Sequence, residues 1–348
     1  MKVAIMAGGT GGHIFPGIAV AKELMKHNVE IVWLGAVGGM EEEIVKKHGI
    51  TMHLLTIKGL RGKGLKGLLT MPFKLFGATR SAGKFLKKEK VSLVVSMGGY
   101  VAGPGGLAAR LKRIPMIVHE QNSKFGMTNK YLSRWARKVL TGFNLNGLYN
   151  STWVGNPVRQ DIEDSKKTEN SDDKARVLII GGSLGAKSLN TRIPGLLKDL
   201  IQSGKILVKH QCGKNNQSIT QENYQSADEV EVVEFIDDMA AIYSWADLII
   251  ARAGALTIAE INAVGLPAIF VPYPYAVDDH QTSNAKYVVD SGAAYIWQES
   301  DSEEKLSSHI KDLVENVELR KQMSEASKKL HKPNCAKTIA DICMEVMA

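Results

Sequence analysis

Three glycine-rich segments are spaced along the chain in a way that suggests phosphate binding. They are GGTGG at residues 8–12, GGYVAGPGG at residues 98–106 and GGSLG at residues 181–185. Each is predicted to form the turn between a strand and the helix that follows it. Glycine permits close backbone approach, and the first N–H groups of the following helix have no partner within it. A diphosphate suits such turns best, although a tight turn without any ligand uses the same glycines.

Two familiar phosphate-binding motifs are nearly matched. A dinucleotide fingerprint needs a third glycine where this chain has Ile14, and an acidic residue after the second strand, which ends here at Gly35. Residues 181–188, GGSLGAKS, approach the nucleoside-triphosphate loop but have Ala186 where that loop needs glycine. The sequence therefore argues against NAD binding and against an ATPase or GTPase.

A fourth segment, AGALTIAE at residues 253–260, follows a predicted strand and opens a helix. Its first N–H groups are again suited to phosphate. Glu260 lies about one turn into the helix, where its carboxylate can accept the two vicinal hydroxyls of a ribose. Favourable placement near the positive end of the helix dipole is the alternative explanation for this glutamate.

Short β-branched runs alternate with amphipathic stretches, which predicts an α/β protein with parallel sheets covered by helices on both faces. The predicted strands are 2–7, 30–34, 93–97, 116–119, 138–141, 176–180, 206–210, 229–234, 247–251, 268–271 and 294–297. Residues 155–174 are polar and highly charged, so they are predicted to be a linker. We expect two Rossmann-like domains, 1–160 and 161–348, facing each other across a cleft. An alternative for the last helix, at about 334–348, is that it crosses back to the N-terminal domain.

The composition limits the class of protein. The 348 residues are 44% hydrophobic and 23% charged, which is enough for two packed cores. Cys212, Cys335 and Cys343 form no Cys-x-x-Cys pair, which argues against a disulfide framework or a cysteine zinc site and fits a reducing cytosol. The apolar run at 3–7 is too short for a signal peptide, and no run reaches the ~20 residues of a membrane span.

Charge is distributed unevenly. Residues 1–160 carry a net charge of +17 and residues 161–348 a net charge of −9. Residues 58–90 hold ten lysines and arginines and one acid, Glu89, among leucines and phenylalanines. This mixture predicts an interfacial helix on an anionic membrane surface. A solvated basic face with its apolar residues packed inward is the alternative. No nucleic-acid-binding motif is recognised, so nucleic acid is not an expected partner.

The motifs, taken in order, resemble those of the MurG family of glycosyltransferases and cover almost the whole chain. The matching segments are MAGGTGGHIFPG (6–17), SMGGYVAGPGG (96–106), HEQN (119–122), GNPVR (155–159), GGSLGA (181–186), EFIDDM (234–239), RAGALTIAE (252–260) and QTSNA (281–285). The resemblance implies a GT-B fold with an N-terminal acceptor domain and a C-terminal UDP-sugar domain. It implies transfer of N-acetylglucosamine (GlcNAc) from UDP-GlcNAc to the C4 hydroxyl of lipid I, an undecaprenyl-diphosphate-linked muramyl pentapeptide, giving lipid II of peptidoglycan. It also implies a peripheral protein on the cytoplasmic face of the membrane.

The resemblance also assigns a donor site by position. Ile236 would hold the uracil through its backbone, Glu260 the ribose, and Ser183 the diphosphate, while Gln281 and Asn122 would bind GlcNAc hydroxyls. The full set that it implies is Thr10, Gly11, Gly12, Asn122, Arg159, Ser183, Ile236, Ala255, Leu256, Thr257, Ile258, Ala259, Glu260 and Gln281. The family often has two adjacent glutamines where this chain has His280 before Gln281, which puts the discrimination between sugars in doubt.

Sugar transfer needs stabilisation of the departing diphosphate and a base for the incoming hydroxyl. The sequence contains no Asp-x-Asp, so we expect helix dipoles and polar donors to replace a metal, with no cofactor. His13, with an ordinary pKa near ~6.5, suits a general base, or else it fixes the glycine turn. Glu120 and Asn122 are the alternative catalytic residues. A single displacement would invert the α-linked donor to a β-linked product.

Two other functions are considered. A UDP-GlcNAc epimerase of the same fold would work without an acceptor and would not need the basic, apolar segment. A binding module that transfers nothing is disfavoured by Glu260 and Gln281.

Overall fold

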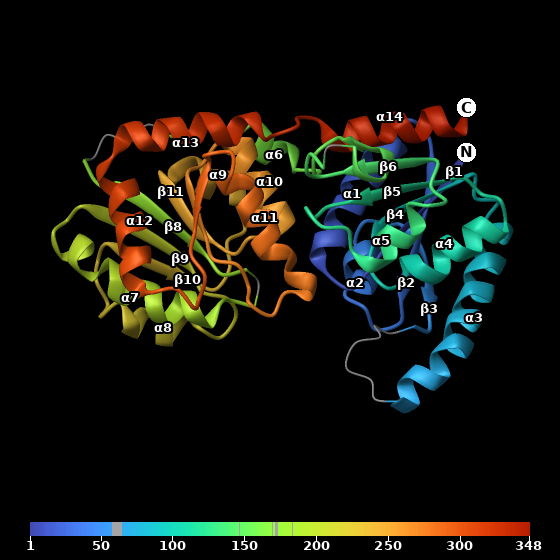
Figure 1. The fold of residues 1–348 in the computed structure, drawn as a ribbon, viewed down its shortest axis with the longest axis horizontal. Coiled ribbons are helices and arrows are strands. Elements are labelled where there is room, and N and C mark those ends of the chain that lie inside the picture. Colours follow the sequence, from blue (N-terminus) through green and yellow to red (C-terminus); the bar gives the residue numbers. More distant parts are fainter. Residues whose placement is uncertain (58–64, 146, 169, 171–172, 183) are drawn as a thin grey trace. The chain divides into compact units, whose positions relative to one another are not determined.

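The computed structural model describes residues 1–57, 65–145, 147–168, 170, 173–182 and 184–348 (Figure 1). These residues form two compact units. The first unit contains Met1–Val158 together with Asn334–Ala348, and the second contains Arg159–Pro333. No helix in the described part of the chain is long and apolar enough to cross a bilayer.

The first unit is built on a seven-stranded parallel sheet of order β3-β2-β1-β4-β5-β6-β7. Its strands are β1 Lys2–Ala7, β2 Glu30–Ala36, β3 Thr51–Leu55, β4 Leu93–Gly98, β5 Met116–Glu120, β6 Lys138–Thr141 and β7 Ser151–Trp153. The strand order reverses between β1 and β4, and ligands bind beyond the carboxyl ends of the strands at such a point. The first two glycine segments follow these two strands.

Helices cover both faces of this sheet. They are α1 Gly11–Lys26, α2 Glu41–Lys46, α3 Leu65–Lys88, α4 Ala102–Leu111, α5 Met127–Leu132 and α14 Cys335–Met347, with a 3₁₀ turn at Leu148–Asn150. Because side chains alternate along a strand, Val3 and Ile5 pack with α1 and α14, whereas Ala4 and Met6 pack with α3 and α4. The final helix α14 therefore belongs to the core of the first unit (Figure 1).

The second unit repeats the plan with a six-stranded parallel sheet of order β10-β9-β8-β11-β12-β13. Its strands are β8 Ala175–Ile180, β9 Ile206–Gln211, β10 Val230–Val233, β11 Leu248–Ala251, β12 Ala268–Phe270 and β13 Ala294–Ile296. Its helices are α6 Gln160–Glu163, α7 Lys187–Gln202, α8 Gln217–Asn223, α9 Met239–Trp245, α10 Ala255–Val264, α11 His280–Val289, α12 Glu303–Glu315 and α13 Val317–Lys329, with a 3₁₀ turn at Val277–Asp279. The order reverses between β8 and β11, which precede the third and fourth predicted binding segments.

Every predicted strand is present, with ends that differ by at most two residues. The strands β3 and β7 were not predicted, because they lie at the two edges of their sheet and lack a continuous apolar run. The predicted linker, 155–174, was too long. Residues 155–158 are buried, and α6 lies within the segment with Ile162 fully buried.

Candidate functional site

The first two glycine segments meet at the carboxyl ends of β1 and β4. Gly98 and Gly99 have φ values of +100° and +81°, and a Cβ added at Gly99 would lie 2.3 Å from the carbonyl oxygen of Gly8. A side chain at this position would collide with the backbone of the other turn, so only glycine lets the turns approach this closely.

A buried carboxylate, Glu41 at the start of α2, fixes the first glycine turn. It is fully buried, and its oxygens accept the N–H of Ala36 at 2.8 Å and the N–H of Gly9 at 3.2 Å. Burial, together with the charge of Glu41, raises the pKa of Tyr100. One of the amides predicted to bind phosphate is therefore already bonded within the protein. The role of Glu41 was not predicted, because it is one of three consecutive glutamates and no local pattern distinguishes it from the other two.

His13 lies in the first turn of α1, against the second glycine turn. Its Nδ1 is 3.3 Å from the Thr10 hydroxyl, and its Nε2 is 3.2 Å from where a Cβ at Gly98 would lie. The side chain is half-buried. Gly11 and Gly12 supply the first amides of the same helix, and such amides have no acceptor within the helix.

The carboxylate of Glu120 is engaged by four donors. One oxygen accepts the backbone N–H and the side-chain amide of Asn122, both at 3.1 Å, and the other accepts the N–H of Gly126 at 3.1 Å and the side-chain amide of Asn129 at 3.0 Å. Glu120 is 2% exposed. The arrangement shapes the loop after β5 and fixes the side chain of Asn122.

The neighbouring His119 is a structural residue. Its Nε2 is 2.9 Å from the carbonyl oxygen of Gly155, so Nε2 donates, and Nδ1 accepts the side-chain amide of Gln121 at 3.0 Å. Burial lowers the pKa of His119 to about 4. Asn156 donates to the carbonyl of Gln121 at 2.9 Å, which ties the segment after β7 to the loop after β5.

In the second unit, Gln211 holds the glycine turn that follows β8. Its side chain accepts the N–H of Gly182 at 3.0 Å, and its amide donates to the carbonyls of Gly182 at 3.0 Å and Glu234 at 2.8 Å. This clamp joins the turn to the segment that leads to the half-buried Ile236. The predicted Ser183 lies outside the described residues.

The N-terminus of helix α10 lies shortly after the carboxyl end of β11. Gly254 caps it with an extended backbone, so Ala255, Leu256 and Thr257 supply its first N–H groups. The side chain of Ile258 is 1% exposed and packs inward, which leaves only its backbone for a ligand.

Glu260, after the half-buried Ala259, is bonded to a buried tyrosine. The hydroxyl of Tyr243 on α9 donates to Glu260 Oε2 at 3.0 Å. Burial raises the pKa of Glu260, while this hydrogen bond and the charge of Arg159 act in the opposite direction. Arg159 precedes α6 and forms an exposed ion pair with Asp161 at 3.6 Å. The charge of Arg159 and the hydroxyl of Tyr243 therefore help to keep the carboxylate ionised.

Gln281, in the first turn of α11, is joined to the loop after β12. Its Oε1 accepts the N–H of Tyr273 at 2.9 Å. Arg252 donates to the carbonyls of Val271 and Pro272, both at 3.1 Å, and so holds the same loop from the other side. The position of Gln281 thus depends on a loop that β11 and β12 jointly anchor.

The structure brings together two groups of predicted site residues, one in each unit. At the carboxyl edge of the first sheet are Thr10, Gly11, Gly12, His13, Glu120 and Asn122, and at that of the second are Ile236, Ala255–Glu260 and Gln281, with Arg159 electrostatically coupled to Glu260. Among the described residues, no group of three His, Cys, Asp or Glu is placed to hold a metal ion.

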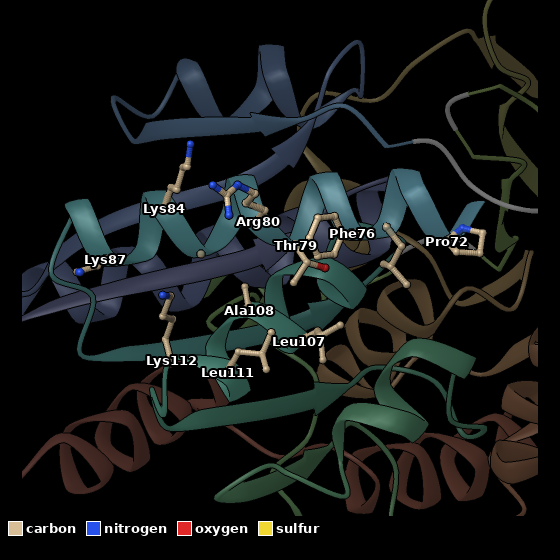
Figure 2. Close-up of a pocket in the computed structure, with 12 residues that line it drawn as sticks. Pro72, Phe76, Thr79, Arg80, Lys84, Lys87, Leu107, Ala108, Leu111 and Lys112 are labelled. Atoms are coloured by element: carbon tan, nitrogen blue, oxygen red, sulfur yellow. The ribbon is translucent and has the colours of Figure 1, made fainter. Parts of the chain in front are cut away.

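A groove of about 630 Å³ separates α3 and α4. Figure 2 shows Phe76, Leu107 and Leu111 lining it, with basic side chains gathered toward the carboxyl ends of both helices. Phe76 is 71% exposed and Leu111 is 68% exposed. The basic residues that line it are Arg80, Lys84, Lys87 and Lys112. Of the predicted 58–90 segment, residues 58–64 lie outside the described residues.

Both halves of the chain match known families. Residues 3–141 match the glycosyltransferase family 28 N-terminal domain, and residues 176–339 match the glycosyltransferase family 28 C-terminal domain. A protein of Xanthomonas axonopodis pv. citri (strain 306) is 46% identical over 349 residues, which cover 99% of this chain and 82% of that protein. It is named UDP-N-acetylglucosamine--N-acetylmuramyl-(pentapeptide) pyrophosphoryl-undecaprenol N-acetylglucosamine transferase.

Solved structures are similar over the same length. MurG of Acinetobacter baumannii is 41% identical, with a TM-score of 0.86 and 99% of each chain covered. A putative UDP-N-acetylglucosamine 2-epimerase from Listeria monocytogenes has a TM-score of 0.68 at 12% identity, covering 99% of this chain and 96% of that one. The second likeness is one of fold alone.

Proposed function

This chain belongs to the family of UDP-N-acetylglucosamine–N-acetylmuramyl-(pentapeptide) pyrophosphoryl-undecaprenol N-acetylglucosamine transferases, and we propose how its residues carry out that transfer. It is a hexosyltransferase of the GT-B fold that transfers GlcNAc from UDP-GlcNAc to lipid I in peptidoglycan synthesis. The observation that carries this function is the 46% identity over 99% of the chain. The epimerase alternative is not supported, since that likeness extends to the fold only.

The second unit is the donor site in this proposal. Glu260 accepts the ribose hydroxyls, since the hydrogen bond from Tyr243 orients its carboxylate and opposes the rise in pKa that burial causes. The diphosphate lies at the first amides of α10, where the helix dipole stabilises the charge that develops on the leaving group. The turn held by Gln211 completes the diphosphate site, and the backbone at Ile236 binds the uracil.

The first unit supplies the base. The C4 oxygen of the acceptor sugar forms a bond to C1 of GlcNAc while the bond from C1 to the diphosphate oxygen breaks and its electron pair leaves with UDP. The hydroxyl proton passes to Nε2 of His13, and Nδ1–H donates to Thr10, which is 3.3 Å away. One displacement inverts the α-linked donor to a β-1,4 linkage.

Glu120 suits this role less well than His13. A general base needs a lone pair that can reach the acceptor hydroxyl, and both oxygens of Glu120 already accept two hydrogen bonds each. Glu120 is 2% exposed as a residue, whereas His13 is half-buried. We therefore assign Glu120 to the positioning of Asn122, which binds a hydroxyl of GlcNAc.

The groove between α3 and α4 is the proposed membrane contact. Exposed Phe73, Phe76 and Leu111 provide apolar anchors, at 80%, 71% and 68% exposure, and the neighbouring basic side chains suit an anionic headgroup layer. An acceptor with an undecaprenyl chain keeps its sugar at the bilayer surface. On this proposal the protein is peripheral and works on the cytoplasmic face, where UDP-GlcNAc is available.

Radiolabelled UDP-GlcNAc tests the reaction directly. With a polyprenyl-diphosphoryl muramyl acceptor, label enters the lipid phase and one UDP is released for each sugar transferred. Without acceptor, neither transfer nor inversion at C2 occurs. Acceptor-independent UDP release with C2 inversion would instead identify an epimerase.

A further inference from the structure

A second cavity, of about 290 Å³, lies in the first unit where α3, α4 and α5 converge. Its lining includes Tyr100, Gly103, Leu107, Met127, Tyr131 and Trp135. Nearly all of the lining is apolar or aromatic, and among the described residues around it Lys74 has the one charged side chain. Met127, Tyr131 and Trp135 are 60%, 54% and 45% exposed, although large apolar side chains close to one another are normally covered.

The position of the cavity connects two features described above. It shares Leu75 and Leu107 with the groove between α3 and α4, so the two hollows are neighbours along the same pair of helices. At its other side, Tyr100 belongs to the second glycine turn, and its ring carbon Cε1 is 3.1 Å from where a Cβ at Gly9 would lie. An apolar surface therefore continues from the proposed membrane contact to the glycine turns beside His13.

We propose that this cavity binds the first isoprene units of the acceptor, next to its diphosphate. This inference rests on the proposed function, because it places the lipid part of that acceptor. A chain rising from the bilayer passes the α3–α4 groove and the cavity before its diphosphate reaches the first amides of α4, which begins at Ala102. Lys74 at the cavity provides a positive charge for the same diphosphate.

The chemistry of the lining favours a hydrocarbon over the other parts of the substrates. A sugar or a nucleotide base needs several hydrogen-bonding partners, and the cavity offers few polar atoms among its aromatic and aliphatic side chains. Its volume is near the lower end of small-molecule sites, so it suits a short stretch of the chain rather than the whole of it.

Filling the cavity tests the proposal. Gly103 lies within α4, and a Cβ there would meet only Thr128 Cγ2, at an ordinary 3.9 Å, so Gly103→Leu adds volume to the cavity without a backbone clash. In detergent micelles, we expect KM for a long-chain prenyl acceptor to rise about tenfold relative to KM for an acceptor with a short water-soluble alkyl group. The matched control is Gly195→Leu in α7, where a Cβ meets nothing within 4 Å. An equal change of both KM values, or no change, overturns the proposal.

A second variant and a binding measurement test the proposal without relying on Gly103→Leu alone or on the rate of sugar transfer. Tyr131→Asp places a charge at an exposed position of the lining and should raise the same KM ratio. Farnesyl diphosphate should change the fluorescence of Trp135 saturably in the wild type and more weakly in Gly103→Leu, with Trp135→Phe removing the signal. If farnesyl diphosphate gives no saturable signal while sugar transfer is normal, the cavity proposal fails and the proposed function stands. If it binds but no sugar is transferred, the proposed function fails instead.

Discussion

The imidazole of His13 rests against Gly98, a residue with φ of +100° at the end of β4. A Cβ at Gly98 would lie 3.2 Å from both Nε2 and Cδ2 of the ring. The candidate base on one glycine turn is thus positioned by the backbone of the next. The two turns can meet in this way because β1 and β4 are neighbours in the sheet.

Replacing His13 should remove the chemistry and leave donor binding intact. For His13→Gln we expect kcat to fall roughly 100- to 10,000-fold, because general-base assistance is lost. Calorimetric affinity for UDP should be unchanged. Full activity of His13→Gln would rule out His13 as the base and return attention to Glu120.

Gly98→Ala tests the contact itself. The added methyl displaces the ring, and the positive φ costs about 1–3 kcal/mol in a residue with a side chain. We expect a lower kcat with little change in KM for UDP-GlcNAc. Because Gly49 also has a positive φ, of +67°, but nothing within 4 Å of an added Cβ, and lies outside both candidate sites, Gly49→Ala is a control for backbone strain without a steric contact. Equal kcat losses in both variants would contradict the positioning role of Gly98.

All strands except β3 and β7, their parallel pairing and the places of the glycine turns could be predicted from the sequence, because buried parallel strands leave continuous apolar runs. The residues that hold the site residues in place through hydrogen bonds could not be predicted in this way. Glu41, Gln211 and Tyr243 act on residues at least 17 positions away in the chain, at Gly9, Gly182 and Glu260. Such contacts are set by how strands stack side by side, and no local pattern distinguishes these residues from ordinary surface or core positions.

Removing the hydroxyl of Tyr243 should make donor binding more sensitive to acid. The hydrogen bond from Tyr243 lowers the pKa of Glu260, whereas burial raises it. In Tyr243→Phe the pKa of Glu260 rises further, so the carboxylate protonates at a higher pH and loses its capacity to accept both ribose hydroxyls. Titrations with UDP between pH 5 and pH 8 should show an affinity loss that begins at higher pH in the variant. If the affinity for UDP has the same pH dependence in the wild type and in Tyr243→Phe, this role of Tyr243 is contradicted.

Gln211→Leu should weaken donor binding without affecting the first unit. The substitution removes one acceptor and two donated hydrogen bonds that fix the turn at Gly182 to Glu234. Losing net hydrogen bonds of about 1 kcal/mol each predicts roughly a tenfold or greater rise in KM for UDP-GlcNAc. KM for the lipid acceptor serves as the internal reference. An unchanged donor KM would show that the clamp is dispensable.

Mild acid should destabilise the protein through its buried histidines. Burial lowers the pKa of His119 to about 4 and that of His210 to about 3, against an ordinary value of 6.5. Both are neutral when folded, and the unfolded chain takes up their protons first. The contribution of these histidines to the free energy of unfolding is therefore fully present above pH 6.5. It decreases as the pH falls toward 4, by at most about 1.4 kcal/mol per pH unit for each histidine. Guanidinium unfolding at pH 7 and pH 5 should show a smaller difference in His119→Gln than in the wild type, and an identical difference would contradict the assignment.

Reversing the basic charges beside the α3–α4 groove should release the protein from anionic vesicles. Each basic group near such a surface contributes about 1 kcal/mol, so Arg80→Glu, Lys84→Glu and Lys87→Glu together should reduce partitioning by roughly 100-fold or more. The matched control reverses Lys311, Lys321 and Lys329, three exposed lysines of the second unit. Sedimentation with vesicles of phosphatidylglycerol and phosphatidylcholine measures the partitioning of each protein at low and high salt. Because salt screens the charges, the difference in partitioning between the groove variant and the wild type should be smaller at high salt. If both triple variants bind as the wild type does, the groove is not the membrane contact, and the exposed phenylalanines of α3 need another partner.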